Sequence, residues 1–237
     1  MDKLSISAHI SHQYNSELED IRSRVLAMGG LVEQQLTNAI TALVEGDIAL
    51  GEHVVASDFK VNAMEVAIDE ECTQIIARRQ PAASDLRLIL AVIKTITDLE
   101  RIGDEAAKIA RMAKAIHQAE RISVPRFNEV KYMADLVLDM LHKALDGFAR
   151  LDATKAVEIA RQDQSVDEEF RLNLRHLITY MMEDPRTISV FIDILFVTKA
   201  IERMGDHAKN MSEYVVYMVK GKDVRHTSLE EIEREVM

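Results

Sequence analysis

Two glutamate–aspartate pairs are the residues of this sequence best suited to chemistry. Glu100 and Asp104 form one pair, Glu202 and Asp206 form the other, and each pair lies in a segment with helical periodicity. Because residues four apart share one face of a helix, the carboxylates of a pair lie about 6 Å apart. Such groups repel one another, so a positive charge is expected among them.

More oxygen-bearing side chains face each pair across a predicted helical hairpin. Pro81 and Pro185 mark the turns, and residues equally far from a turn stand level in an antiparallel hairpin. Asp58 and Asp104, for example, each lie 23 residues from Pro81. Each half of the chain therefore gathers four such side chains at one height. The first cluster comprises Asp58, Asn62, Glu100 and Asp104, and the second cluster comprises Asp163, Asp167, Glu202 and Asp206.

The positive charge for these clusters has two possible sources. Arg101 and Arg203 adjoin the pairs in sequence; alternatively, each cluster binds a metal ion. Oxygen-only ligation favours magnesium, manganese, calcium or iron, whereas zinc is possible but prefers nitrogen or sulfur. His207 follows Asp206 but points about 100° away around the helix, so it is not expected to be a ligand. A solvated acidic helix face that binds nothing is the alternative reading.

The two halves of the chain repeat one pattern. Apolar residues at spacings of three and four surround Glu100, and they recur around Glu202 at an offset of 102. Upstream of these motifs the offset is 105, so the first half holds three extra residues. Glu65 corresponds at that offset to Phe170 and is therefore expected to be a surface charge.

This periodicity predicts an all-α fold. Short connections force consecutive helices to lie antiparallel, so we expect two pseudosymmetric three-helix bundles in an elongated molecule. The predicted domains are residues 1–120, residues 121–220 and a charged tail, 221–237, with a helical turn or two from Ser228. The six helices are expected at about Ile10 to Val44, Asp47 to Arg79, Ala83 to Gln118, Pro125 to Arg150, Asp152 to Glu183 and Pro185 to Lys220, with a loop from Ala119 to Pro125.

Composition narrows the function classes. The 237 residues carry a net charge of −11, which argues against a nucleic-acid partner because no basic stripe is available to neutralise phosphates. No membrane span or targeting segment is apparent, so we expect a cytoplasmic protein that reaches a membrane only through partners. The sequence contains no glycine-rich phosphate loop and no evident nucleophile constellation, so it is not expected to be an enzyme.

Four of the glycines inside predicted helices bear on packing. Gly29 and Gly30 each cost about 1 kcal/mol relative to alanine, and they indicate either a tolerated kink or close approach of another backbone. Gly103 and Gly205 precede the aspartates of both pairs, which suggests a close backbone contact there.

The chain resembles the PhoU family of bacterial phosphate-signalling accessory proteins over nearly its whole length. The residues that carry the resemblance are Val61-Asn62-x-Met64-Glu65, Pro81-x-x-x-Asp85-Leu86-Arg87, Leu99-Glu100-Arg101-Ile102-Gly103-Asp104, Tyr180-Met181-Met182-Glu183 and Ile201-Glu202-Arg203-Met204-Gly205-Asp206. The resemblance implies two PhoU repeats, each with a multinuclear metal site at the positions of the first and second clusters.

The resemblance also implies a regulatory role. Members of the family repress the phosphate-starvation response, restrain phosphate uptake and commonly form homodimers. They are thought to link the ATPase subunit of the phosphate ABC transporter to the sensor histidine kinase PhoR. The competing interpretations are a metal-dependent enzyme, in which the carboxylate clusters activate water or oxygen, and a purely structural helical scaffold.

Two departures weaken the first cluster. The family motif has an aspartate where this chain has Asn62, which offers only a neutral oxygen. Lys108 stands where the second half has Asn210, and a nearby ammonium would oppose a cation. If only one cluster binds a metal, the sequence therefore predicts the second.

Overall fold

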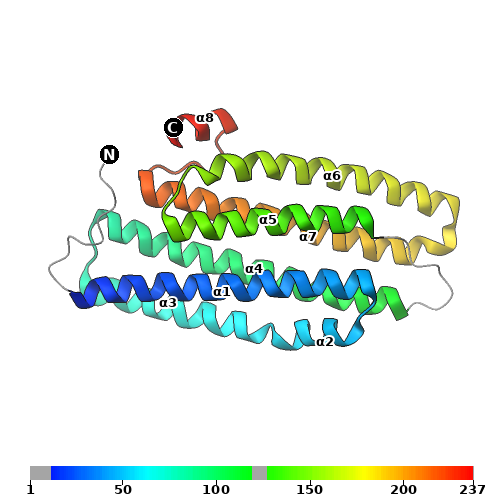
Figure 1. Cartoon of the computed structure of the whole chain (residues 1–237), viewed down its shortest axis with the longest axis horizontal. Coiled ribbons are helices and arrows are strands. Elements are labelled where there is room, and N and C mark those ends of the chain that lie inside the picture. Colours follow the sequence, from blue (N-terminus) through cyan, green and yellow to red (C-terminus); the bar gives the residue numbers. More distant parts are fainter. Residues whose placement is uncertain (1–11, 119–126, 237) are drawn as a thin grey trace.

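A computed structural model describes residues 12–118 and 127–236, and every long element in these ranges is a helix. Two three-helix bundles lie side by side along the long axis of the molecule (Figure 1). The elements are α1 (His12–Glu45), α2 (Ile48–Ser57), α3 (Phe59–Arg79), α4 (Ala83–Gln118), α5 (Asn128–Arg150), α6 (Lys155–Glu183), the 3₁₀ helix η2 (Pro185–Thr187), α7 (Ile188–Lys220) and α8 (Leu229–Val236). None of the described helices is long and apolar enough to cross a membrane.

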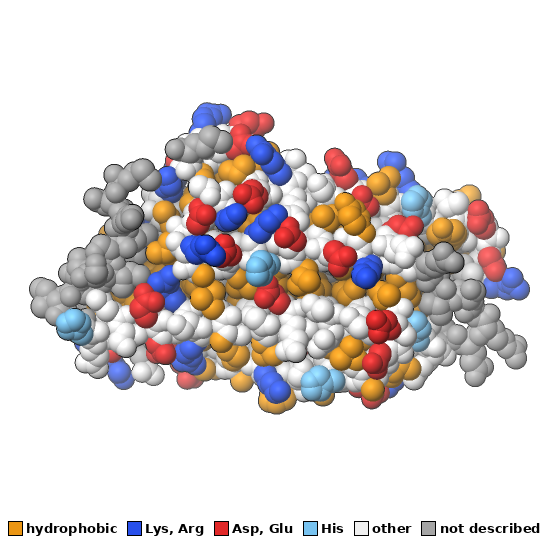
Figure 2. Space-filling model, viewed as in Figure 1, with side chains coloured by type: hydrophobic (Ala, Val, Ile, Leu, Met, Phe, Trp, Pro, Cys, Tyr) orange, Lys and Arg blue, Asp and Glu red, His pale blue; other side chains and the backbone are white. Residues whose placement is uncertain are grey.

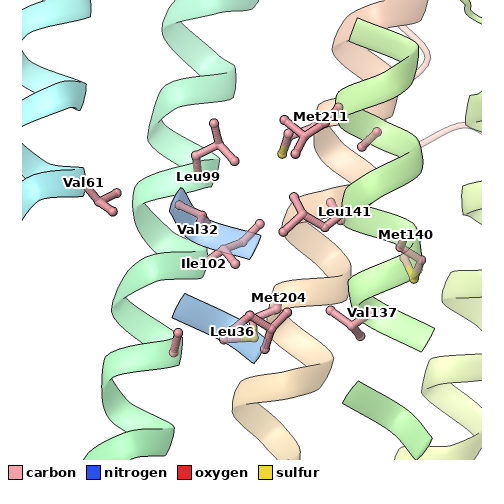
Figure 3. Packing of buried hydrophobic residues seen from close by; sticks show 14 of the residues in the cluster. Val32, Leu36, Val61, Leu99, Ile102, Val137, Met140, Leu141, Met204 and Met211 are labelled. Atoms are coloured by element: carbon pink, nitrogen blue, oxygen red, sulfur yellow. The ribbon is translucent and has the colours of Figure 1, made fainter. Parts of the chain in front are cut away.

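The predicted repeat architecture is confirmed. In the first bundle α1 and α4 pack with α2 and α3, and in the second α5, α6 and α7 pack together. The bundles meet mainly through α4 and α7. Figure 3 shows Leu99 and Ile102 of α4 and Met204 of α7 within one hydrophobic core that runs through both bundles. These side chains are fully buried, as the sequence periodicity predicts.

One predicted helix is wrong in its continuity. The segment from Asp47 to Arg79 forms α2 and α3, which are separated by a single turn residue, Asp58. The Asp58 carbonyl accepts a hydrogen bond from the amide of Val61 at 2.9 Å, which tightens the chain to a three-residue turn. The break was not expected, because no proline or glycine marks this position. The low helix propensity of aspartate is too weak a signal by itself to end a helix.

The starts of two other helices, α6 and α8, also differ from expectation or extend it. Helix α6 begins at Lys155 rather than Asp152, because Leu151 adopts a left-handed backbone conformation with φ of 56°. The tail forms α8, and Ser228 and Glu231 make a reciprocal capping box at its start. The expected loop from Ala119 to Pro125 lies outside the described residues, as does the predicted first domain boundary.

The paired glycines of α1 have opposite environments. A Cβ atom placed on Gly29 would lie 2.4 Å from Cδ2 of Leu145 on α5, whereas one on Gly30 would meet nothing within 4 Å. The close approach at Gly29 is therefore real, but its neighbour is a side chain of the second bundle rather than a backbone. Gly30 is a tolerated glycine.

We expect alanine substitutions at these two neighbours to change stability in opposite directions. Gly29→Ala should lower the free energy of unfolding by about 1–3 kcal/mol, because the methyl group overpacks the contact with Leu145. Gly30→Ala should raise it by about 0.5–1 kcal/mol, since alanine is the better helix former. Urea denaturation of both variants measures the difference. Equal effects would contradict a close packing of α1 against α5 at Gly29.

Candidate metal centres

The fold brings three carboxylates of the first cluster together. Asp58 lies at the junction of α2 and α3, opposite Glu100 and Asp104 on α4. Burial, followed by the charge of Asp104, raises the pKa of the Asp58 carboxyl. Burial and then the charge of Asp104 likewise raise the pKa of Glu100. Asp58 and Asp104, which the hairpin count predicts at the same height, therefore lie close together.

Two more residues of α3 bear on this cluster. Asn62 is exposed one helical turn after Asp58, and its membership of the cluster stays a prediction. Glu65, expected to be a plain surface charge, instead lies close enough for its charge to raise the pKa of Glu100. It shares a helix face with Asp58 and Asn62 at spacings of three and four, which is the signal that could have identified it.

Gln35 of α1 was missed as a member of the site. It is 2% exposed, and its Nε2 donates a hydrogen bond to Oδ1 of Asp58 at 3.5 Å. Its Oε1 is buried without a hydrogen-bond partner in the described part of the chain. A polar residue on the core-facing stripe of α1 is the signal that could have found it. The matching residue of the second repeat is Met140.

Glycine at position 103 lets α4 approach this group. A Cβ atom there would lie 3.1 Å from Oε1 of Gln35 and 3.4 Å from Oδ1 of Asp58. At Gly205 the nearest atom would be a methyl carbon of Val137 at 3.4 Å, an ordinary contact. The predicted close backbone contact is therefore wrong at both glycines, because their neighbours are side chains. Only Gly103 is tightly packed.

The second cluster gathers its four carboxylates around Asp206. Although Asp206 is exposed on α7, desolvation by neighbouring atoms raises the pKa of its carboxyl. The charges of Glu202, Asp163 and Asp167 raise it further. The four acids that the hairpin count placed together are thus close in space.

Basic side chains already neutralise this second cluster. Nζ of Lys209 lies 2.8 Å from Oδ2 of Asp163, and Nζ of Lys199 lies 2.6 Å from Oε2 of Glu202. Arg171 lies 3.6 Å from Asp167. Burial lowers the pKa of Lys209, but its hydrogen bond and charge interaction with Asp163 outweigh burial and leave the pKa raised. The second cluster therefore contains an ammonium group of the protein's own.

Of the basic residues expected at the clusters, one stays there and two pair with another acid. Arg101 lies 3.6 Å from Glu100 and forms an ion pair at the first cluster, as one of the two alternatives from the sequence has it. Arg203 pairs with Glu105 of α4 at 2.8 Å, and Lys108 pairs with the same carboxylate at 3.1 Å. The predicted opposition of Lys108 to a cation at the first cluster stays a prediction. His207 faces Asp98 of α4 at 2.6 Å, in agreement with its exclusion from the second cluster.

The two clusters differ in how well they fit a metal ion. Within residues 12–118 and 127–236, no three acidic, histidine or cysteine side chains converge tightly enough to share one ion as they stand. The first cluster nevertheless offers repelling carboxylates and the unpartnered amide oxygen of Gln35, which are the hard ligands that magnesium, manganese or iron accept. The second cluster would have to displace Lys209 from Asp163.

Comparisons with known proteins agree with the repeat. A family model described as the PhoU domain matches residues 25–113 and 130–215. The phosphate-specific transport system accessory protein PhoU homolog of Pseudomonas putida is 52% identical over 237 residues, which are 100% of this chain and 92% of that protein. Its counterpart PhoU in Escherichia coli K12 is 48% identical over 99% of this chain and 96% of that protein.

Solved structures share the fold. The crystal structure of PhoU from Pseudomonas aeruginosa superposes with a TM-score of 0.85 at 50% identity, and it covers 88% of this chain and 100% of that one. The phosphate transport system regulatory protein PhoU from Streptococcus pneumoniae gives a TM-score of 0.82 at 28% identity, over 89% of this chain and 99% of that one.

Proposed function

This chain belongs to the PhoU family, and on that premise we propose that it is an accessory protein of phosphate transport that represses the phosphate-starvation response when phosphate is abundant. The observation that carries the proposal is full-length similarity. Relatives named as accessory proteins of the phosphate-specific transport system align with all or nearly all of this chain at about half identity. Both repeats and their clusters fall inside that alignment.

We further propose that the protein acts as a cytoplasmic adaptor. Its partners would be the ATPase subunit of the phosphate ABC transporter and the sensor histidine kinase PhoR, with membranes reached only through them. Two long bundles with extensive helical faces suit an adaptor, since helix faces are common docking surfaces. Hydrophobic, acidic and basic side chains are interspersed on the face that Figure 2 shows. Assembly as a homodimer is part of the same proposal. The accessory names of the relatives favour this role over a metal-dependent enzyme.

The carboxylate clusters are proposed to bind divalent or trivalent metal ions, such as iron, manganese, magnesium or zinc. Asp58, Glu100 and Asp104 would supply charge at the first cluster, with Gln35 and Asn62 as neutral oxygen donors. Asp163, Asp167, Glu202 and Asp206 would do so at the second. The ion pair of Lys209 with Asp163 supports a ranking opposite to that expected from Asn62. The first cluster should therefore hold the metal ion more readily.

The regulatory role can be tested in a bacterium that carries this chain, with a reporter of the starvation response. In phosphate-replete medium, deletion of the gene should switch the reporter on, and the intact gene should restore repression. A reporter that stays off after deletion would contradict the proposed repression. For the adaptor role, the purified chain should retain the transporter ATPase and the sensor kinase in pull-down experiments. Binding to neither would refute that role.

A further inference from the structure

The C-terminal segment covers a groove on the second repeat. Helix α8 lies along α6 at the outer face of the bundle (Figure 1). Its apolar residues Ile232 and Val236, with Val224 before them, are buried. They pack in one cluster on Ala153, which precedes α6, and on small and branched side chains of α6 and α7, namely Ala156, Val157, Ala160 and Val216. An amphipathic helix thus fills the groove between α6 and α7.

The first repeat has the same groove, and no described residue covers it as α8 covers the second. The residues that match Ala156, Val157, Ala160 and Val216 line an open, almost wholly apolar pocket of about 250 Å³ between α2 and α4. They are Gly51, Glu52, Val55 and Lys114, joined by Ala56, Ala110 and Arg111. In the described part of the chain, α2 packs mainly on α4, α1 and α3, and α8 lies on the other bundle (Figure 1).

Charge indicates what kind of helix fits the uncovered groove. Helix α8 carries four glutamates in eight residues, and one of them, Glu233, pairs with Arg161 at the edge of its own groove. The groove on the first repeat is edged by two cations of α4, Arg111 and Lys114. Lys114 pairs with Glu52 of α2 at 2.7 Å, so the excess positive charge of this edge comes from Arg111. An acidic helix with apolar residues four apart, like Ile232 and Val236, would complement both its apolar floor and its basic edge.

We propose that the groove between α2 and α4 is a docking site for an acidic amphipathic helix of a partner protein. The partner helix would occupy on the first repeat the place that α8 occupies on the second. The site adjoins the first cluster, because the charge of Arg111 acts on Asp58. The inference rests on the proposed adaptor function, because it assumes that this chain binds partner proteins.

The experiment uses the full-length chain and a hydrocarbon-stapled, fluorescent peptide with the sequence of residues 228–237. Fluorescence anisotropy should show saturable binding. Ala56→Trp fills the groove from an exposed position, and Lys114→Glu reverses its edge charge, so each should weaken binding about tenfold or more. Lys131→Glu reverses an exposed charge on α5 and should leave binding unchanged. Thermal melting confirms that the variants are folded.

Four outcomes would overturn the proposal. The peptide could fail to bind, or bind equally well to the Ala56→Trp chain. It could also bind only after Ile232→Glu has released the chain's own α8, which would assign binding to the second repeat. Finally, light scattering could show a dimer that Ala56→Trp dissociates, which would assign the groove to a second copy. None of these outcomes alters the reporter assay, so failure of this proposal is distinguishable from failure of the proposed function.

Discussion

Replacing Asp58 and Asp104 together by alanine is expected to lower the affinity of the first cluster for manganese(II) by more than about a hundredfold. Removal of a residue that only hydrogen-bonds to a metal ligand typically lowers metal affinity about 10- to 100-fold. This variant removes two charged ligands. The carboxylates of Asp58 and Asp104 also repel one another, since the charge of Asp104 raises the pKa of Asp58. A bound cation would relieve this repulsion. Isothermal titration of the chelator-treated chain measures the loss.

Two comparisons sharpen this prediction. Glu202→Ala with Asp206→Ala should change manganese affinity less, because Lys199 and Lys209 already neutralise the second cluster. Gln35→Met copies the residue at the matching position of the second repeat. It removes the neutral amide oxygen and the hydrogen bond from Nε2 to Asp58 but no charged ligand, so it should weaken binding by less than the double variant. Wild-type affinity in the Asp58/Asp104 variant would refute a metal site at the first cluster.

Glu213→Gln is expected to stabilise the protein by about 3 kcal/mol at pH 8.5 and to change its stability little near pH 4. Burial raises the pKa of Glu213 to about 7 from its ordinary 4.5, with the charge of Lys209 opposing the rise and that of Asp163 adding to it. Each unit of pKa shift corresponds to about 1.4 kcal/mol.

The sign of the effect follows from proton binding. Between about pH 4.5 and pH 7 the folded chain keeps the Glu213 proton while the unfolded chain has released it, so the stability of the wild type falls as the pH rises. Above pH 7 the ionised, 7% exposed carboxylate carries its full cost, which glutamine avoids. Urea denaturation at both pH values tests this, with Glu70→Gln at an exposed position of α3 as the control. A stability gain that is equal at both pH values would exclude Glu213 ionisation as its cause.

Periodicity predicted the fold because long amphipathic helices with short connections allow few arrangements. The apolar residues around Glu100 and Glu202 lie in the core where their spacing of three and four puts them. The break at Asp58 was not predictable, because it depends on one tightened turn and no glycine or proline marks it.

Hairpin counting also brought the right carboxylates together, since it needs only the turn positions and the helix rise. It failed for the side chains that decide their charge balance. Lys209 and Gln35 reach the clusters through packing between helices, and their partners lie 46 and 23 residues away. For Lys108, the sequence argument considered its effect on the first cluster, whereas the structure pairs its ammonium group with the nearby Glu105.

The most direct measurement of the central claim is the reporter of the starvation response in phosphate-replete cells whose only copy of the chain carries Asp58→Ala, Asp104→Ala, Glu202→Ala and Asp206→Ala. If metal ions at the clusters serve repression, this variant should accumulate to the wild-type level and leave the reporter switched on. Full repression by the variant at the same protein level would contradict a regulatory role for the clusters.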